Sequence, residues 1–341
     1  KNALDSARKV IAKSINAKSA DEIIFTSGGS ESDNLALKGV AYALRDKGNH
    51  IIVSKIEHPA VREACKTLEK DGFKIAYLNV DNDGFVDLKE LEEAITDKTI
   101  LVSIIHGNNE VGTIQPLEKI GKICMKHNVL VHSDAVQSYT KAKIDVKKMN
   151  ISLLSLSAHK IHGPKGIGAL YVRSGVKLKK IIDGGPQESK LRAGTENIPG
   201  VVGFAAAVKL ANRKDIEKMQ RLKDKLISGI FETIPDVKLN GSHEKRLCNN
   251  VNISFKGAEA ESIGTYLNIK GIETSSGSAC SSHSLEPSYV LLALGLNPAL
   301  ANTTLRFTRS KFTTEDEIDY TLSVLPGIIK KLRRFSPFCN E

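Results

Sequence analysis

Short apolar runs and longer amphipathic stretches alternate along the first two thirds of the chain. Runs such as 22–26 and 50–54 are largely apolar and predict buried strands, whereas 3–15 places apolar residues at helical spacing. The further predicted strands are 74–79, 99–105, 129–133, 151–156 and 168–172. The further predicted helices are 31–46, 60–70, 87–95 and 117–127. This alternation predicts an α/β fold with a mostly parallel central sheet flanked by helices, and the close spacing of the last two strands allows one of them to run antiparallel.

The pattern changes after about residue 210. A long charged amphipathic helix is expected over 215–231, and shorter elements follow it. These are strands near 237–240, 249–255 and 303–308 and helices near 258–268 and 314–333. The mixture predicts a smaller α+β domain, so we expect a large domain over residues 1–213 and a small domain over 214–341.

Composition narrows the class of protein. Apolar residues make up 41% and charged residues 26% of the 341 residues, which is ordinary for a globular protein. No apolar run approaches the ~20 residues of a membrane-spanning helix, and the first residues lack a secretory signal, so we expect no membrane partner. The net charge of +10 comes from basic residues spread along the chain without interleaved aromatics, which favours a solvated surface over a nucleic-acid interface.

The five cysteines are scattered and odd in number, unlike a disulfide framework, so we expect a reducing, cytoplasmic setting. Cys280 stands out because it lies in a run of small polar residues, 275–284, where a thiol is exposed and can move, as a nucleophile must. The spacings Cys280–His283 and Cys124–His127 also fit pairs of zinc ligands. A zinc site needs four ligands, so core or surface roles are favoured for these residues.

Polar residues follow the predicted strands at their carboxyl ends, where ligands bind in open parallel sheets. They are Ser27–Ser30, His58, His106–Glu110, Asp134, Ser157, His159 and Lys160. We expect all of them to face one crevice.

Three of these features together suggest a cofactor. The glycine-containing turn before a helix suits a phosphate, although the local sequence alone favours a tight turn with a serine N-cap. Asp134 suits a protonated pyridine nitrogen or an N-cap, with Gln137 close enough in sequence to contact the same ligand. Lys160 suits a Schiff base with a carbonyl group, although most lysines are surface charges. In combination they predict a pyridoxal phosphate site.

Arg306 lies in the predicted strand 303–308, where it can hold a substrate carboxylate or form an ordinary surface salt bridge.

Seven motifs occur in one order along nearly the whole chain. They are Phe25–Asn34 (FTSGGSESDN), Glu57–His58, Asn108–Gly112 (NNEVG), His132–Gln137 (HSDAVQ), Ser157–Lys160 with Gly163–Gly166 (SAHK, GPKG), Arg192–Thr195 (RAGT) and Ser275–Cys280 (SSGSAC). The set resembles the cysteine desulfurases of the class V aminotransferases, which are pyridoxal-phosphate-dependent transferases of fold type I. The loop around Cys280 resembles the subgroup that serves iron–sulfur cluster assembly.

The resemblance implies roles by matching positions. It implies that Lys160 carries the cofactor as a Schiff base, that His58 stacks on the ring, and that Asp134 binds the ring nitrogen. The phosphate would be held by Gly29, Ser30, Ser157 and His159, and by Thr195 from a second subunit, which implies a homodimer. Gln137 would contact the ring hydroxyl, and Asn109 would face both cofactor and substrate. Arg306 would bind the substrate carboxylate, and Cys280 would attack the substrate sulfur.

The implied reaction converts L-cysteine to L-alanine and leaves a persulfide on Cys280 for an acceptor such as an iron–sulfur scaffold protein. Cys280 is also the one residue for which transient iron–sulfur ligation is implied, and no other metal site is expected. A selenocysteine lyase, another class V lyase or transaminase, and a non-catalytic scaffold remain alternatives.

The sequence departs from the family pattern in three places. Arg309 and Lys311 follow Arg306 where the family has a Leu-Gly pair and one basic residue, and His283 replaces a small residue. We also expect that a segment of the small domain, which the family carries before Lys1, is absent from this sequence.

Overall fold

The structure is a computed structural model that describes residues 2–276 and 286–335. Two compact units make up the chain. The large unit contains Lys1–Asn79, Val86–Gly107 and Gln115–Asn212, and the C-terminal unit contains Val80–Phe85, Asn108–Ile114 and Arg213–Glu341. The main division lies close to the boundary that we proposed, but two short earlier segments belong to the C-terminal unit, which the sequence pattern alone did not indicate.

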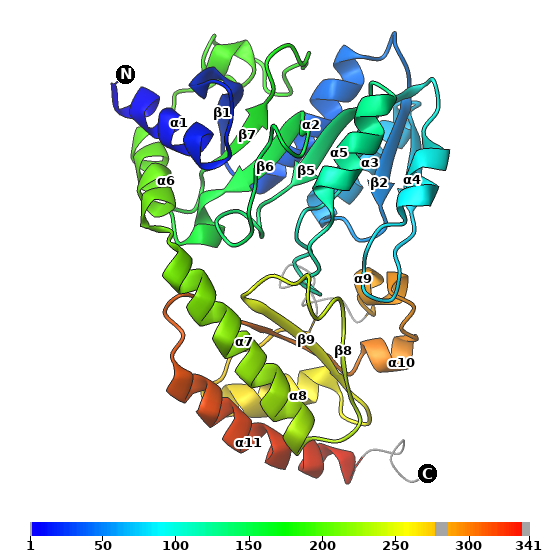
Figure 1. The fold of residues 1–341 in the computed structure, drawn as a ribbon, viewed down its shortest axis with the longest axis vertical. Helices are drawn as coiled ribbons and strands as arrows, with labels where there is room; N and C mark the ends of the chain where they lie inside the picture. Colours follow the sequence, from blue (N-terminus) through cyan, green and yellow to red (C-terminus); the bar gives the residue numbers. More distant parts are fainter. Residues whose placement is uncertain (1, 277–285, 336–341) are drawn as a thin grey trace. The chain divides into compact units, whose positions relative to one another are not determined.

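The large unit is built on a seven-stranded sheet (Figure 1). Its strands are β1 (Ile23–Thr26), β2 (His50–Ser54), β3 (Lys74–Leu78), β4 (Thr99–Ser103), β5 (Leu130–Asp134), β6 (Leu153–Ser157) and β7 (Gly168–Val172). Their order is β1-β7-β6-β5-β4-β2-β3, and only β7 runs antiparallel to its neighbours. This confirms the predicted fold class and the antiparallel member of the last pair.

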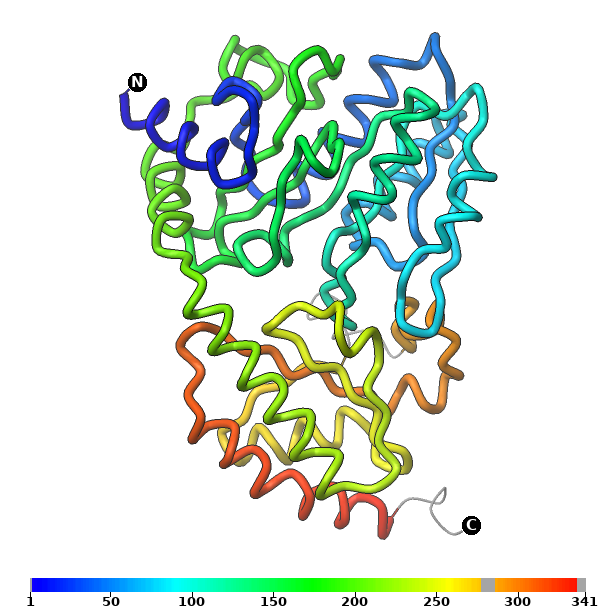
Figure 2. The backbone as a smooth tube through the Cα atoms, in the orientation of Figure 1, coloured from blue at the N-terminus to red at the C-terminus, as the bar shows by residue number. Residues whose placement is uncertain are grey.

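Helices cover the sheet because each buries one apolar face. They are α1 (Asn2–Ser14), α2 (Gly29–Ala43), α3 (Pro59–Lys70), α4 (Leu88–Ala94), α5 (Leu117–Lys126) and α6 (Ile198–Leu210), with 3₁₀ turns η1 (Ala20–Glu22), η2 (Ala158–Ile161) and η3 (Glu188–Lys190). Helix α2 packs against α3 and β6, and α1 packs along α6 (Figure 2). A core around Leu35, Ile51 and Leu101 joins α2 to the sheet.

The C-terminal unit has a three-stranded antiparallel sheet ordered β10-β9-β8. Its elements are α7 (Arg213–Thr233), β8 (Val237–Leu239), β9 (Asn250–Phe255), α8 (Ala260–Ile269), α9 (Tyr289–Ala293), α10 (Pro298–Ala301), β10 (Thr304–Thr308) and α11 (Glu315–Arg333). Helices α7, α8 and α11 pack together and bury a core that includes Leu226, Ile253 and Leu325.

Helix α6 is the main element that the sequence pattern missed. Its residues IPGVVGFAAAVKL are apolar almost all round, so no amphipathic period marks them as helical. An N-cap is nevertheless present, because the side chain of Asn197 accepts a hydrogen bond from the Gly200 N–H at 3.0 Å, and Pro199 lies in the first turn.

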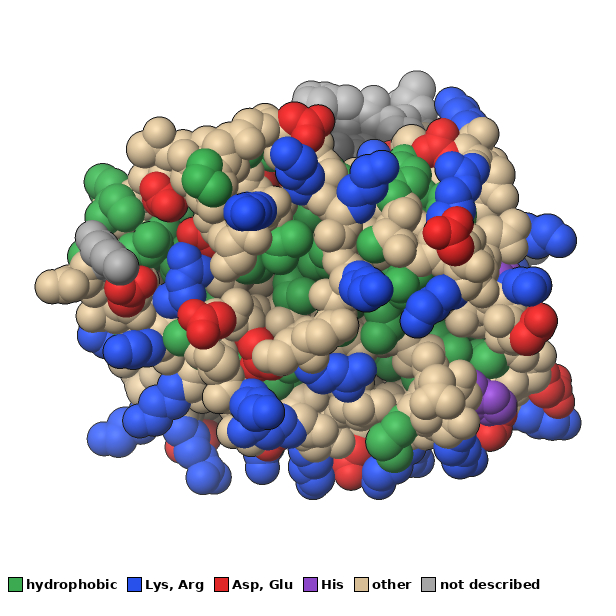
Figure 3. All heavy atoms as spheres, turned by 90° about the horizontal axis from the view of Figure 1, so that it is seen from above, with side chains coloured by type: hydrophobic (Ala, Val, Ile, Leu, Met, Phe, Trp, Pro, Cys, Tyr) green, Lys and Arg blue, Asp and Glu red, His purple; other side chains and the backbone are tan. Residues whose placement is uncertain are grey.

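No described helix is both long enough and apolar enough to cross a membrane. On the face drawn in Figure 3, Lys and Arg side chains are dispersed among acidic and neutral ones rather than gathered in one patch.

Candidate active site

The turn between β1 and α2 forms an anion cradle. Helix α2 begins at Gly29 after an N-cap, Gly28, that has no side chain, so the serine N-cap considered from the sequence is not present. The N–H groups of the first helical turn therefore have no intrahelical acceptor and are available to an anion. A Cβ atom on Gly29 would lie 2.6 Å from Val136 Cγ2, so any side chain at this position would require Val136 to shift.

Ser157 and His159 lie at the carboxyl end of β6 and in η2. The Ser157 hydroxyl and His159 Nδ1 form a hydrogen bond of 2.8 Å, and the imidazole and hydroxyl can both contact a phosphate. Burial and the neighbouring lysines, Lys160 first among them, lower the pKa of His159. The imidazole is accordingly a neutral hydrogen-bonding partner rather than a second cation.

Asp134 ends β5 beside His58. A carboxylate oxygen of Asp134, a ring nitrogen of His58 and a carboxylate oxygen of Asp33 lie within 4.8 Å of one another. Asp134 Oδ1 accepts a hydrogen bond from the Val136 N–H at 2.8 Å, and His58 Nδ1 accepts one from the Ala60 N–H at 3.1 Å as the N-cap of α3. Both side chains are thus held by backbone groups.

Three buried carboxyl groups crowd together at this edge of the sheet. Burial raises the pKa of Asp134, while the nearby His58 and Lys160 oppose that rise. Burial raises the pKa of Glu57 to about 8, although its carboxylate accepts hydrogen bonds from the Ser54 hydroxyl and from the Ile105 N–H at 2.9 Å. Burial and the neighbouring Asp134 carry the pKa of Asp33 well above its usual range. Asp134 is the one of the three that lies near both His58 and Lys160.

Lys160 lies in η2 with an exposed side chain, and Gln137 lies half-buried just beyond β5. The ammonium group of Lys141 donates to the carbonyl of Gln137 at 2.9 Å and to that of Lys160 at 3.0 Å. Lys141 therefore joins the two backbone segments that carry these side chains.

The segment that carries Thr195 is anchored by two ion pairs. Arg8 forms a bidentate pair with Glu188 at 2.7 and 2.8 Å, and Glu188 Oε2 also accepts from the Phe25 N–H of β1 at 2.7 Å. Glu188, Ser189 and Lys190 all have positive φ values, so η3 is a short left-handed turn. The exposed Thr195 follows this turn.

The second ion pair joins this segment to the phosphate cradle. Arg192 Nε lies 3.0 Å from Glu31 Oε1, and Glu31 Oε2 accepts from the Ser27 N–H at 2.8 Å. Glu31 therefore holds the start of the Ser27–Ser30 turn while it binds Arg192.

The two predicted substrate residues meet within the C-terminal unit. Arg306, half-buried in β10, donates from Nη1 to the Asn109 carbonyl at 2.8 Å. Arg306 and Ser275 also exchange backbone hydrogen bonds of 2.7 and 3.2 Å as an antiparallel bridge. Ser275 opens the run that contains Cys280, so the start of this run is fixed to Arg306. Cys280 and His283 themselves lie outside the described residues.

The structure thus brings Gly29, Ser30, His58, Asp134, Gln137, Ser157, His159 and Lys160 to the carboxyl edge of the large unit's sheet. It joins Asn109 to Arg306 in the other unit. Sequence reasoning did not assign roles to Asp33, Glu57, Arg8 and Glu188. Asp33 is one of the two buried polar side chains of α2, next to Ser32, in a helix whose other buried positions are apolar or glycine.

These features fit pyridoxal phosphate. The uncapped helix start suits its phosphate, the buried Asp134 suits its ring nitrogen, and Lys160 supplies an amine at the same edge.

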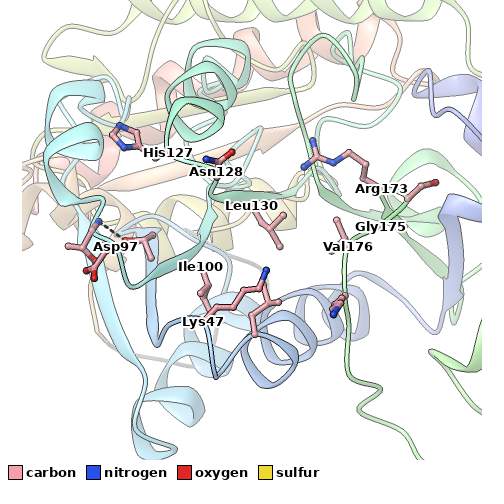
Figure 4. A pocket seen from close by; sticks show the side chains of 14 residues that line it. Lys47, Asp97, Ile100, His127, Asn128, Leu130, Arg173, Gly175 and Val176 are labelled. Atoms are coloured by element: carbon pink, nitrogen blue, oxygen red, sulfur yellow. Dashed lines mark hydrogen bonds between the residues drawn. The ribbon is translucent and has the colours of Figure 1, made fainter.

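A separate hollow of about 490 Å³ lies at the opposite, amino-terminal edge of the same sheet (Figure 4). It is lined by residues such as Lys47, Asp97, His127 and Arg173. None of the residues that line this hollow belongs to the candidate active site. The candidate active site is recognised from its place at the carboxyl ends of the strands and from its buried carboxyl groups.

Comparison with known proteins agrees with this picture. The family model of the class V aminotransferases matches residues 1–321. A relative named cysteine desulfurase IscS, from Dictyoglomus turgidum, is 51% identical over 344 aligned positions that cover 100% of this chain and 87% of the relative. A solved NifS-like protein is 38% identical with a TM-score of 0.89 and covers 97% of this chain and 88% of its own. A structure described as SspA in complex with cysteine is 39% identical, with a TM-score of 0.81 and coverages of 92% and 88%.

The fold and the composition of the site define a pyridoxal-phosphate-dependent enzyme of fold type I. The chain belongs to the class V aminotransferase family.

Proposed function

We propose that the protein is a cysteine desulfurase that releases L-alanine from L-cysteine and holds the sulfur on Cys280 as a persulfide. The bridge between Ser275 and Arg306 carries this proposal. It fixes the start of the cysteine-bearing run to the arginine that is suited to the substrate carboxylate. A transaminase needs no thiol. A link between the substrate-binding arginine and the run that contains Cys280 is therefore useful for sulfur transfer but not for amino transfer.

Each residue has a physical task in the proposed reaction. Pyridoxal phosphate, when bound, supplies an electron sink for negative charge at the substrate α-carbon. Asp134 would pair with the ring nitrogen and His58 would lie on the ring, while the helix start at Gly29 and Ser30 would hold the phosphate. Lys160 would move the α-proton.

Arg306 and Asn109 would orient the substrate for sulfur transfer. The Cys280 thiolate would form a bond to the substrate sulfur as the carbon–sulfur bond breaks, so the sulfur stays on the enzyme. The acceptor of that sulfur would be a protein of iron–sulfur assembly.

A homodimer would complete the site, because Thr195 has an exposed side chain suited to the phosphate of a second subunit's cofactor. Helix α6 begins three residues later and exposes a stripe at Ile198, Val202 and Leu210, which are 36%, 44% and 65% exposed. A second copy would cover this stripe. Val202→Glu should shift sedimentation from dimer to monomer and weaken cofactor binding. A dimer that survives this change would place the interface elsewhere.

A reducing, cytoplasmic compartment suits a thiol nucleophile. Cys65, Cys124 and Cys248 are buried and take part in no disulfide, which is compatible with such a compartment.

The decisive experiment incubates the holoenzyme with L-cysteine and a dithiol reductant, which releases the persulfide sulfur as sulfide, and measures alanine and sulfide. Lys160→Ala should remove the visible absorption band of the bound cofactor, and Cys280→Ser should keep the band and stop sulfide release. Cys124→Ala is the matched control, because Cys124 is buried in α5 and burial raises its pKa to about 12. Normal sulfide release by Cys280→Ser would contradict the proposal, and faster turnover of selenocysteine than of cysteine would indicate a selenocysteine lyase.

A further inference from the structure

Asp33 is a buried carboxyl group for which the proposed reaction has no task. It is 1% exposed in the second turn of α2. One of its oxygens lies within 4.8 Å of a carboxylate oxygen of Asp134 and of a His58 ring nitrogen. Two carboxylates at this separation in a dry environment cannot both be ionised at moderate free-energy cost.

The groups around each carboxyl decide which one carries the charge. Asp134 faces His58 and Lys160 and accepts the Val136 N–H. Asp33 faces the Ser155 hydroxyl on β6 and two further acids, Asp134 and Glu57.

The remaining neighbour of Asp33 is the imidazole of His132 on β5, whose Nε2 lies 3.7 Å from Asp33 Oδ1. That imidazole is no counter-ion. His132 Nδ1 bonds to the Ser103 hydroxyl at 2.8 Å and Nε2 to the Ser155 hydroxyl at 3.0 Å, and burial lowers its pKa to about 3. A line of neutral groups, from Ser103 through His132 and Ser155 to Asp33, thus runs across three adjacent strands to α2.

We propose that Asp33 is held as a neutral carboxylic acid and positions Asp134, so that Asp134 is the single anion available to the cofactor ring nitrogen. This rests on the role proposed above for Asp134. A neutral acid can donate its O–H toward a neighbouring carboxylate without adding a second negative charge. The hydroxyl and imidazole groups of this line fix the orientation of the Asp33 side chain. The backbone of α2 fixes the position of its Cα atom.

Asp33→Asn separates this proposal from the alternatives, because asparagine keeps the shape and a neutral hydrogen-bond donor but cannot ionise. We expect the apoprotein of Asp33→Asn to bind pyridoxal phosphate within about threefold of the wild type. Asp33→Ala should weaken binding about tenfold, because it leaves Ser155 and Asp134 without their neighbour. Asp134→Asn should weaken it more than either. Equal losses in Asp33→Asn and Asp134→Asn would show that Asp33 is an anion, and an unaffected Asp33→Ala would show that it positions nothing.

A second measurement does not depend on cofactor binding or on turnover. Protonated carboxylic acids have an infrared carbonyl band that carboxylates and amides lack. The difference spectrum of wild type minus Asp33→Asn near neutral pH should contain that band, with Glu57→Gln as a reference for a second buried acid. Absence of the band would overturn the proposal. Its presence in a protein that makes no alanine from cysteine would refute only the proposed reaction.

Discussion

The two units differ in the sign of most of the charged side chains that they bury, although the C-terminal unit also buries one acid, Glu110. The large unit buries Asp33, Glu57 and Asp134 at the carboxyl edge of its sheet, whereas the C-terminal unit buries Lys223, Arg246 and Arg309.

The units also tolerate their buried charges in different ways. A carboxyl group can become neutral by keeping its proton, but an arginine cannot readily lose one. Arg246 is accordingly surrounded by acceptors, since it donates to the carbonyls of Ser242, Val111 and Asn240. Arg309 has a long contact of 3.4 Å to the Cys248 carbonyl, and its Nε and Nη1 have no acceptor among the described residues.

The largest effect on activity should follow from removal of the Asp134 carboxylate in the large unit. Asp134→Asn should lower the rate of alanine formation by about a hundredfold or more, because the ring nitrogen would lose the counter-ion proposed for it. Steady-state kinetics at saturating cofactor would measure this. Retention of most of the rate would show that the acidic cluster does not serve the cofactor.

Arg306→Leu should act on substrate binding and spare the cofactor. Loss of a charge-assisted contact to the carboxylate should raise KM for L-cysteine by roughly 30-fold to 100-fold. The cofactor absorption spectrum of this variant serves as the control and should stay unchanged. A normal KM would assign the carboxylate to another residue.

Two arginines of the C-terminal unit should respond in opposite directions. Arg246→Met should lower the free energy of unfolding by about 3 kcal/mol, because several buried carbonyls lose their donor. Arg309→Met should raise it by about 1 kcal/mol, because it removes a buried cation whose Nε and Nη1 have no acceptor among the described residues. Denaturant unfolding of both variants would test the pair, and similar destabilisation by both would show that Arg309 has acquired a partner such as a buried water.

Glu57→Gln should change how stability depends on pH. The Glu57 pKa is raised from 4.5 to about 8 in the folded protein, so the folded state keeps a proton that the unfolded state loses. This contribution is fully present below pH 4.5 and disappears as the pH rises through about 8. Thermal unfolding from about pH 5 to about pH 9 should therefore decline less in the variant than in the wild type. Parallel curves would mean that Glu57 titrates normally.

Charges on the surface give the smallest expected effect. Lys89 and Glu93 lie 3.7 Å apart with side chains 84% and 68% exposed. Lys89→Ala should move the melting temperature by no more than about 1 °C, because water screens this pair. A clearly larger change would show that exposed pairs stabilise this protein as buried ones do.

The fold was largely predictable because its signal is local. Alternation of apolar runs with helical spacing located every strand of the large unit, and the ligand edge followed from parallel topology. Helix α6 was missed because it lacks a polar face, and the segment Asn108–Ile114 could not be assigned to the C-terminal unit because its partners, Arg246 and Asn250, come about 140 residues later in the chain.

The site was predictable only where single residues carry recognisable chemistry. Lys160 and Asp134 were proposed from strand ends and motif spacing, whereas the proposed positioning of Asp134 by Asp33 depends on three-dimensional crowding. The Arg8–Glu188 pair joins residues 180 positions apart, so no local sequence pattern predicts it.

That same distance has a consequence for synthesis on the ribosome. Strand β1 is an edge strand that pairs only with β7, and its Phe25 N–H bonds to Glu188. At typical translation speeds of about 5–20 residues per second, Arg8 emerges roughly 10 to 40 seconds before Glu188. The nascent chain must keep α1 and β1 without their later partners, α6 and β7, throughout that interval, so this segment is among the last parts of the large unit to complete its packing.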